Sequence, residues 1–123
     1  MKYFAFALCL FLVACSSDED STPPDEESCS EEFVYGLVIT VNDAATGAGL
    51  NQVDITAREP SYTEVLVATP TAGVYQGAGE RVGSYTLTVE RDGYQTVVTD
   101  VITVEADECH VITQARTFSL QEL

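Results

Sequence analysis

The stretch at residues 83–94 constrains the fold of this chain more than any other. Apolar and polar side chains alternate over residues 85–90, which is the period-two pattern of a strand with one buried face. An Arg-Asp-Gly turn follows, and an Asp-Gly pair tolerates the positive φ that tight hairpin turns require. Tyr94 opens a second run rich in β-branched residues, which reaches Thr99. The stretch therefore predicts a strand, a turn and a return strand.

Short runs of the same kind recur along the chain after residue 32, at spacings of about ten residues. Gly, Pro, Asn and Asp separate them, and no helical periodicity appears after residue 14. This pattern predicts an all-β domain folded as an antiparallel, seven-stranded β-sandwich. The expected strands cover residues 33–41, 53–57, 64–69, 74–76, 83–90, 94–105 and 111–120.

Two of these runs contain a local interruption. Pro60 is expected to end the second strand, since proline cannot continue a ladder of hydrogen bonds. The last run begins with two adjacent apolar residues on opposite faces and ends with Phe118 and Leu120 on one face. We expect a bulge near residues 113–116 to reconcile the two halves.

The N-terminus has the features of an export signal. Lys2 precedes an unbroken apolar run over residues 3–14, which is shorter than the roughly 20 residues that span a bilayer. The run ends in Leu-Val-Ala-Cys at residues 12–15, which resembles the lipobox of bacterial lipoproteins. The resemblance implies that residues 1–14 are a signal peptide and that Cys15 carries the acyl chains of a membrane anchor. An ordinary signal peptide with an incidental cysteine is the alternative.

Residues 15–32 are expected to be a lipidated N-terminus and a disordered acidic tether, because they contain almost nothing apolar to bury. Residues 16–32 hold eight acidic residues and no basic one, and residues 33–123 hold twelve acidic residues against four arginines. No basic patch is available to follow a phosphate backbone, which excludes nucleic acid as a partner. The serine and acidic run after Cys15 resembles the surface-export signal of some lipoproteins. It implies an outer-membrane lipoprotein that faces either the periplasm or the cell surface.

The cysteine count predicts a disulfide. Of the four cysteines, Cys9 leaves with the signal peptide and Cys15 is acylated, so Cys29 and Cys109 remain. An even remainder in an exported protein favours a bridge between them. It would close a loop of 80 residues between the two positions, for which chain entropy gives a stabilisation of about 4 kcal/mol.

Several motifs follow one another in a specific order: residues 38–41 with Asp43, Thr46-Gly47, residues 73–75, residues 83–89 and Gly93-Tyr94. Together they resemble the carboxypeptidase regulatory-like domain over roughly residues 33–120, and Glu80-Arg81 and residues 107–111 add a likeness to small bacterial lipoproteins. The resemblance implies a transthyretin-like (prealbumin-like) Greek-key sandwich at residues 33–123. In the carboxypeptidases this domain is an accessory beside the catalytic zinc domain. The resemblance therefore implies a non-enzymatic module.

His110 is the only histidine and the main candidate for catalysis. Zinc takes three or four ligands, and a Ser-His-Asp arrangement would have to use His110 inside the closing strand. No Gly-x-Ser-x-Gly elbow occurs in the chain. His110 is therefore expected to be a strand residue beside the disulfide, and neither a catalytic residue nor a cofactor is predicted.

Calcium is the better ion candidate, because hard cations take oxygen ligands from acidic loops. No EF-hand spacing is present, so scattered solvated acids are favoured and no metal site is predicted. The acids considered are Asp43, Asp92, Asp107 and Glu108.

Tyr62 and Tyr75 are the aromatic residues expected to be exposed, and they are possible ligand contacts. Sugar-binding sandwiches present aromatic platforms that favour tryptophan, which this chain lacks. Packing or incidental exposure of the two tyrosines is the alternative and is favoured.

These observations predict a non-enzymatic cell-envelope lipoprotein that displays a β-sandwich as an interaction or structural module. Its partners would be the membrane, through Cys15, and an envelope protein or glycan. The alternative is a ligand- or glycan-binding lipoprotein that assists an envelope transport system, with binding lost on mutation of Tyr62 or Tyr75. An enzyme that depends on His110 is the third possibility.

The predicted bridge can be tested by thiol alkylation of the denatured, unreduced mature protein. We expect no labelled thiol, because Cys15 is acylated and Cys29 and Cys109 are bridged. Mass spectrometry counts the labels, and prior reduction should reveal two. Two labelled cysteines without reduction would contradict the pairing.

Overall fold

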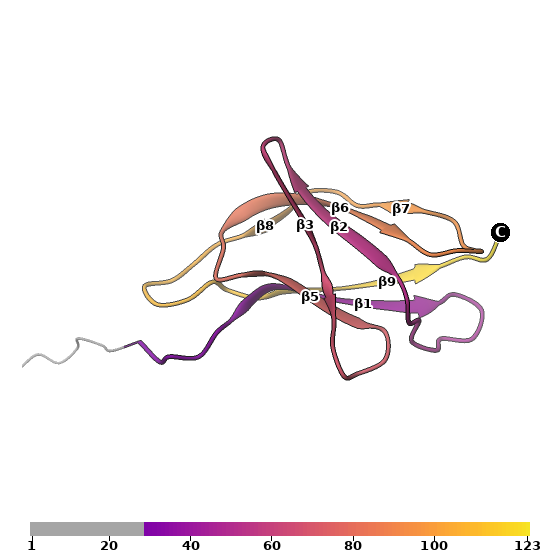
Figure 1. Cartoon of the computed structure of the whole chain (residues 1–123), viewed down its shortest axis with the longest axis horizontal. Helices are drawn as coiled ribbons and strands as arrows, with labels where there is room; N and C mark the ends of the chain where they lie inside the picture. The colour runs from indigo at the N-terminus through magenta and orange to yellow at the C-terminus, as the bar shows by residue number, and fades with distance from the viewer. Residues whose placement is uncertain (1–28) are drawn as a thin grey trace, which may run out of the picture.

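The structure, a computed structural model, describes residues 29–123. These residues form an all-β domain of two packed sheets and contain no helix (Figure 1). Residues 1–28, with the predicted signal peptide, Cys15 and most of the predicted tether, lie outside the described residues. In chain order the strands are β1 (Tyr35–Asp43), β2 (Asp54–Glu59), β3 (Tyr62–Val65), β4 (Val67–Ala68), β5 (Val74–Gly79), β6 (Gly83–Glu90), β7 (Val97–Val98), β8 (Ile102–Val104) and β9 (Gln114–Leu120).

The strands divide into two sheets with β1 and β6 at their centres. The four-stranded sheet has the order β4–β5–β1–β9. The five-stranded sheet has the order β3–β2–β6–β7, and β8 also pairs with β6. Figure 1 shows the C-terminus at one end of the long axis and the chain leading into β1 at the other. This arrangement agrees with the predicted β-sandwich.

The core lies between the inner faces of the two central strands. Side chains at every second position of β1 and β6 are fully buried, as the alternation in the sequence predicts. Burying each such side chain stabilises the fold by about 1.5–3 kcal/mol. These residues are Leu37, Ile39 and Val41 on β1 and Tyr85, Leu87 and Val89 on β6.

The hairpin predicted at residues 83–94 forms, but its return strand is short. The Tyr94 amide donates to the Arg91 carbonyl at 3.0 Å, which closes the expected turn. The chain then pairs with the C-terminus, where the Gln95 amide donates to the Gln121 carbonyl at 2.8 Å. Because this other segment satisfies the backbone after the turn, β7 is only two residues long.

The last strand corrects the expectation of a purely antiparallel sandwich. β9 runs parallel to β1, in a register that places Leu37 opposite Gln114 and Asp43 opposite Leu120. β8 belongs to the other sheet, so the chain crosses between the sheets over residues 105–113 and brings β9 in from the same end as β1. A period-two pattern is the same in either strand direction, so the sequence carried no signal for this pairing.

Two predicted strands are each divided, which gives nine strands instead of seven. The run at residues 64–69 leaves one sheet for the other at Leu66, since β3 pairs with β2 and β4 pairs with β5. Leu66 is buried, and its amide donates to the Ile55 carbonyl at 2.9 Å. The run at residues 94–105 is divided into β7 and β8 by residues 99–101.

The prediction that Pro60 ends the second strand is confirmed, since β2 ends at Glu59, whereas the predicted bulge takes another form. Pro60 lies in the turn of the β2–β3 hairpin, because Glu59 pairs with Tyr62 directly across it. No bulge is needed within β9. The change of face is made before β9 begins, where Val111 forms an isolated bridge with Ala106.

Gly73 and Gly47 offer a matched pair of substitutions. Both have a left-handed backbone, with φ of 82° and 80°, where a Cβ costs roughly 1–2 kcal/mol. A Cβ on Gly73 would also lie 2.7 Å from the Gly49 Cα and 2.9 Å from the Val41 carbonyl oxygen, whereas one on Gly47 meets nothing within 4 Å.

We therefore expect Gly47→Ala to lower the free energy of unfolding by about 1 kcal/mol and Gly73→Ala to lower it by more than about 2–3 kcal/mol. Urea unfolding of the purified protein measures both. Equal losses would show that the backbone at Gly73 has room for a side chain.

Candidate functional site

Three segments meet at the end of the domain where the chain enters β1. They are the N-terminal segment at residues 29–34, the turn between β5 and β6, and the loop between β8 and β9. Cys29 and Cys109 lie at disulfide distance, with their Cα atoms 5.2 Å apart, and so join the first segment to the third. This is the pair that the cysteine count predicts. We call this set of contacts the junction, formed by Cys29, Ser30, Glu80, Cys109 and His110.

Glu80 lies at the centre of the junction, in the β5–β6 turn. Its φ of 48° is in the left-handed region, which a residue with a side chain adopts only at a cost. One carboxylate oxygen accepts from the Val34 amide at 2.9 Å and the other from the Val111 amide at 3.4 Å. The Val34 amide first, and then His110, hold the pKa of Glu80 below its ordinary value. The side chain of Glu80 thus fastens two other segments to a strained turn.

The His110 ring lies between Glu80 and Ser30. Its Nδ1 is 2.7 Å from Glu80 Oε2, and its Nε2 is 3.1 Å from the Ser30 carbonyl oxygen and 3.0 Å from the Ser30 Oγ. The hydrogen bond with Glu80 raises the pKa of His110, while partial burial opposes the rise. Asp107 shapes the loop, because its Oδ1 accepts from the amides of Cys109 and His110 at 2.8 and 2.9 Å. His110 therefore lies in a bend of this loop and not in the predicted strand.

The order Ser30, His110, Glu80 is that of a nucleophile, a base and an orienting acid. The contacts of the ring oppose this use. Nε2 also faces the Ser30 carbonyl oxygen, which requires a proton on that nitrogen, whereas a general base needs a free lone pair there. The raised pKa of His110 favours the same protonated form. The geometry suits a ring that ties two segments together better than one that activates a serine.

Tyr75 corrects one expectation, since it is buried with 3% of its surface exposed. Its hydroxyl donates to the Leu50 carbonyl at 2.8 Å and accepts from the Val53 amide at 3.1 Å. A buried ring with a satisfied hydroxyl cannot act as a binding platform. Tyr75 instead holds the loop before β2 against the core.

Tyr62 is half-buried, and one face of its ring is covered. The Arg81 guanidinium lies 3.4 Å from the ring centroid, and the Tyr62 hydroxyl donates to Glu64 at 2.8 Å. Arg81 also pairs with Glu59 at 2.6 Å and donates to the Tyr85 hydroxyl at 2.9 Å. The structure therefore does not bring Tyr62 and Tyr75 together as a site, and Arg81 occupies the face that a sugar ring would need.

The acids considered for calcium serve local structure or stand apart. Asp43 accepts from the Tyr94 hydroxyl at 2.6 Å and from the amides of Ala45 and Thr46 at 2.7 and 3.0 Å. These contacts, the tyrosine first, lower the pKa of Asp43. Asp107 is engaged by the amides of its own loop. Over residues 29–123, no three His, Cys, Asp or Glu side chains gather closely enough to hold a metal ion.

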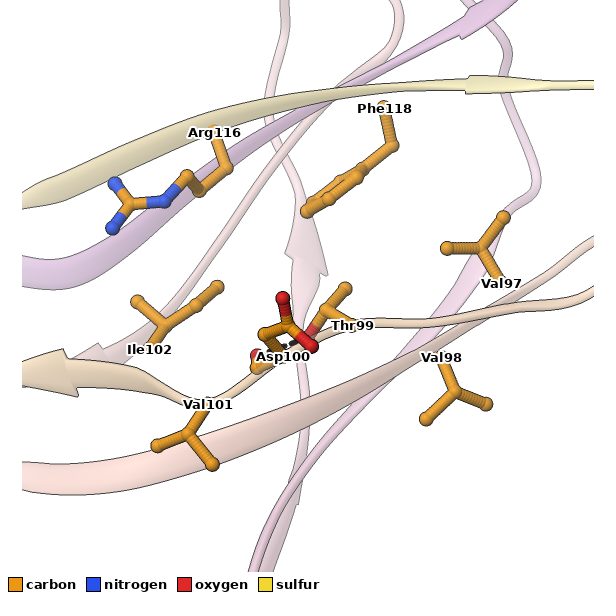
Figure 2. Close-up of a pocket in the computed structure, with 8 residues that line it drawn as sticks. All are labelled: Val97, Val98, Thr99, Asp100, Val101, Ile102, Arg116 and Phe118. Carbon is orange, nitrogen blue, oxygen red and sulfur yellow. Dashed lines mark hydrogen bonds between the residues drawn. The ribbon is translucent and has the colours of Figure 1, made fainter.

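A groove of about 390 Å³ opens between β9 and the segment at residues 97–102 (Figure 2). Arg116 and Phe118 on β9 form one wall, and the segment forms the other. In Figure 2 the Phe118 ring and the Asp100 carboxylate point into the gap, while the Arg116 guanidinium extends to one side of it. We call this feature the edge groove.

Both walls of the edge groove are sheet edges, since β9 ends the four-stranded sheet and β7 ends the five-stranded one. Val98 and Val101 are 65% and 61% exposed, although soluble proteins usually place charges on such edges. Thr99 interrupts the backbone pairing of this segment with β6. Its Oγ1, in place of a backbone carbonyl, accepts from the Leu87 amide at 3.1 Å. The groove thus combines exposed apolar side chains with strand edges that no described strand covers.

Sequence reasoning missed both features for identifiable reasons. Ser30 and Glu80 are 80 and 30 residues from His110, so no local motif links the three. Glu80 was noticed only as part of the Glu80-Arg81 pair in the likeness to small bacterial lipoproteins, without a structural role. The groove has a weak signal in the sequence, where Thr99 and Asp100 interrupt an otherwise apolar run.

Over residues 29–123, no helix is long and apolar enough to cross a membrane. Comparison with models of known protein families gives no match, and comparison with curated proteins gives none either.

A fluorophosphonate probe, which bonds covalently to activated serines, tests whether Ser30 is a nucleophile. We expect no adduct below about pH 6.5, where the raised pKa keeps the His110 ring protonated and leaves it no lone pair to act as a base. Mass spectrometry detects the adduct, with a known serine hydrolase as the positive control. Labelling that disappears in both Ser30→Ala and His110→Gln would contradict this prediction and indicate an enzyme.

Proposed function

We propose that this protein is a cell-envelope lipoprotein, anchored in the outer membrane at Cys15, that displays a non-enzymatic interaction module. Residues 15–32 serve as the tether, and residues 33–123 form a carboxypeptidase regulatory-like sandwich with transthyretin-like Greek-key topology. The lipobox-like residues 12–15 support the anchor. The pair Cys29 and Cys109 at disulfide distance supports an oxidising compartment, where such bridges persist.

The edge groove is the observation that carries the interaction role. Uncovered strand edges accept an added strand from another protein, with side-chain pockets beside the edge that give specificity. Phe118, Val98 and Val101 supply apolar contacts beside such an edge. An envelope protein with an extended segment is therefore the partner that the groove fits best.

The contacts of the polar side chains support a non-enzymatic role. The ring of His110 is engaged on both nitrogens, and Asp43 accepts three hydrogen bonds. Glu59 is likewise occupied by Arg81 and by the Ser84 amide. Groups held in this way stabilise the fold and are poorly placed to bind a reacting substrate.

A second candidate function is favoured by the size and mixed lining of the same groove. A volume of about 390 Å³ is within the range of small-molecule sites, and Arg116 and Asp100 add charges to an apolar lining. A ligand- or glycan-binding accessory to a transport system would use these residues in place of Tyr62 and Tyr75.

Photo-crosslinking in intact cells tests the proposal. A photoreactive residue at Val98 or Val101 is expected to give a discrete adduct with another protein. Val67, which is 60% exposed on the edge strand β4, is the matched control and should give several-fold less. Adducts are read by gel shift and mass spectrometry. Adducts with glycan alone would favour the second candidate, and equal or absent adducts at all three positions would contradict a role for the groove.

A further inference from the structure

The His110 ring faces two acceptors from two different segments. Glu80 Oε2 lies 2.7 Å from Nδ1 and belongs to the β5–β6 turn, and the Ser30 carbonyl oxygen lies 3.1 Å from Nε2 and belongs to the N-terminal segment. A carboxylate and a carbonyl can only accept, so each needs an N–H on the ring. Only the doubly protonated imidazolium carries both N–H groups at once.

We propose that His110 is a pH-dependent clamp that holds the N-terminal segment on the domain while its ring is protonated and loosens that segment when the ring becomes neutral. A neutral ring keeps one proton, and the charged Glu80 is the stronger acceptor for it. Nε2 then presents a lone pair to the Ser30 carbonyl oxygen, which repels it. Nε2 can still accept from the Ser30 Oγ, which requires the serine to turn away from its present carbonyl contact.

Each segment packed against the ring contributes a different kind of group. The β5–β6 turn contributes the carboxylate of Glu80, while the neighbouring Arg81 is directed to Glu59. The loop that holds His110 contributes Asp107, which adds to the raised pKa of the ring. The N-terminal segment contributes only the uncharged oxygens of Ser30 to the ring, and acids follow it at positions 31 and 32. Cys29 and Cys109 lie at disulfide distance, and bridged thiols do not titrate.

The direction of the effect follows from the two pKa shifts. The pKa of His110 is raised from 6.5, so the hold is complete below about pH 6.5 and is lost as the pH rises through the folded value. The pKa of Glu80 is lowered from 4.5, so its share is complete above about pH 4.5 and is lost as the pH falls through its folded value. The clamp is therefore closed at mildly acidic pH and opens when the pH rises through the folded pKa of His110.

The bridge limits the extent of the opening. Because Cys29 stays beside Cys109, only residues 30–34 can move when the ring is neutral. This short stretch includes the Val34 amide on Glu80 and Phe33, whose ring packs edge-on against Tyr35 with centroids 5.2 Å apart. The change is therefore local, at the point where the tether meets β1, and it does not depend on the proposed function.

The sole histidine makes this proposal simple to test by NMR on the mature lipidated protein in detergent micelles. Titration of the ring proton signals from about pH 5 to about pH 9 gives the pKa of His110, which we expect to lie above 6.5. The amide signals of Val34 and Val111 should shift with the same midpoint. Order parameters of residues 31–34 should fall at the alkaline end, with several-fold faster exchange of the Val34 amide after correction for intrinsic chemistry.

Three variants separate the clamp from a general loss of structure. Glu80→Gln keeps one acceptor oxygen, enough for the shorter bond from the Val34 amide but not for the 3.4 Å contact with Val111, and removes the charge, so the pKa of His110 should fall toward its ordinary value. Ser30→Ala keeps the carbonyl acceptor and removes only the hydroxyl, so it is the matched control and should preserve the coupled transition. His110→Gln should leave residues 31–34 mobile at every pH.

Three outcomes would overturn the proposal. One is a pKa of His110 at or below 6.5. Another is a set of order parameters for residues 31–34 that stays constant while the His110 ring titrates. The third is a Glu80→Gln variant whose His110 titrates as in the unmodified chain.

Discussion

The packing of β1 against β6 is the constraint on which the rest of this structure depends. Each is the central strand of its sheet, and each buries every second side chain against the other. Because the register of a strand fixes which side chains face inward, this packing also fixes the position of every neighbouring strand. The outer strands are left with one uncovered edge. The junction lies where the chain passes between the sheets, and the edge groove lies between an edge of one sheet and an edge of the other.

The junction and the edge groove differ in what they require of the fold. The junction needs three distant segments to meet, and Glu80 accepts hydrogen bonds from two of them while it occupies a strained turn. Such strain persists only where surrounding contacts determine the backbone. The edge groove needs only two strands that end their sheets side by side. A partner can therefore bind at the groove without disturbing the end of the domain that receives the tether.

The sequence predicted the elements better than their connections. Alternation located β1 and β6 and their buried faces, because burial of one face leaves a period-two pattern. It could not show that β9 is parallel to β1, nor that the chain changes sheets at Leu66, since both depend on tertiary pairing. The Cys29–Cys109 pair was found by counting, whereas Ser30 and Glu80 carry no sequence signal that links them to His110. The expectation that Tyr75 lies at the surface was wrong. Its ring is buried because its hydroxyl finds hydrogen-bond partners inside the domain, which the sequence could not show.

The parallel pairing of β1 and β9 has a mechanical consequence when it is considered together with the bridge. Tension on the chain ahead of Cys29 divides at that residue, passing through the backbone into β1 and through Cys109 into the loop that leads to β9. Both strands are then pulled from the same end, along their length. Because β1 and β9 are pulled in the same direction, the hydrogen bonds between them are not set against one another, and the two strands share the load. The Cys29–Cys109 pair and the parallel pairing thus spread a pull on the chain ahead of Cys29 over two strands of the sheet.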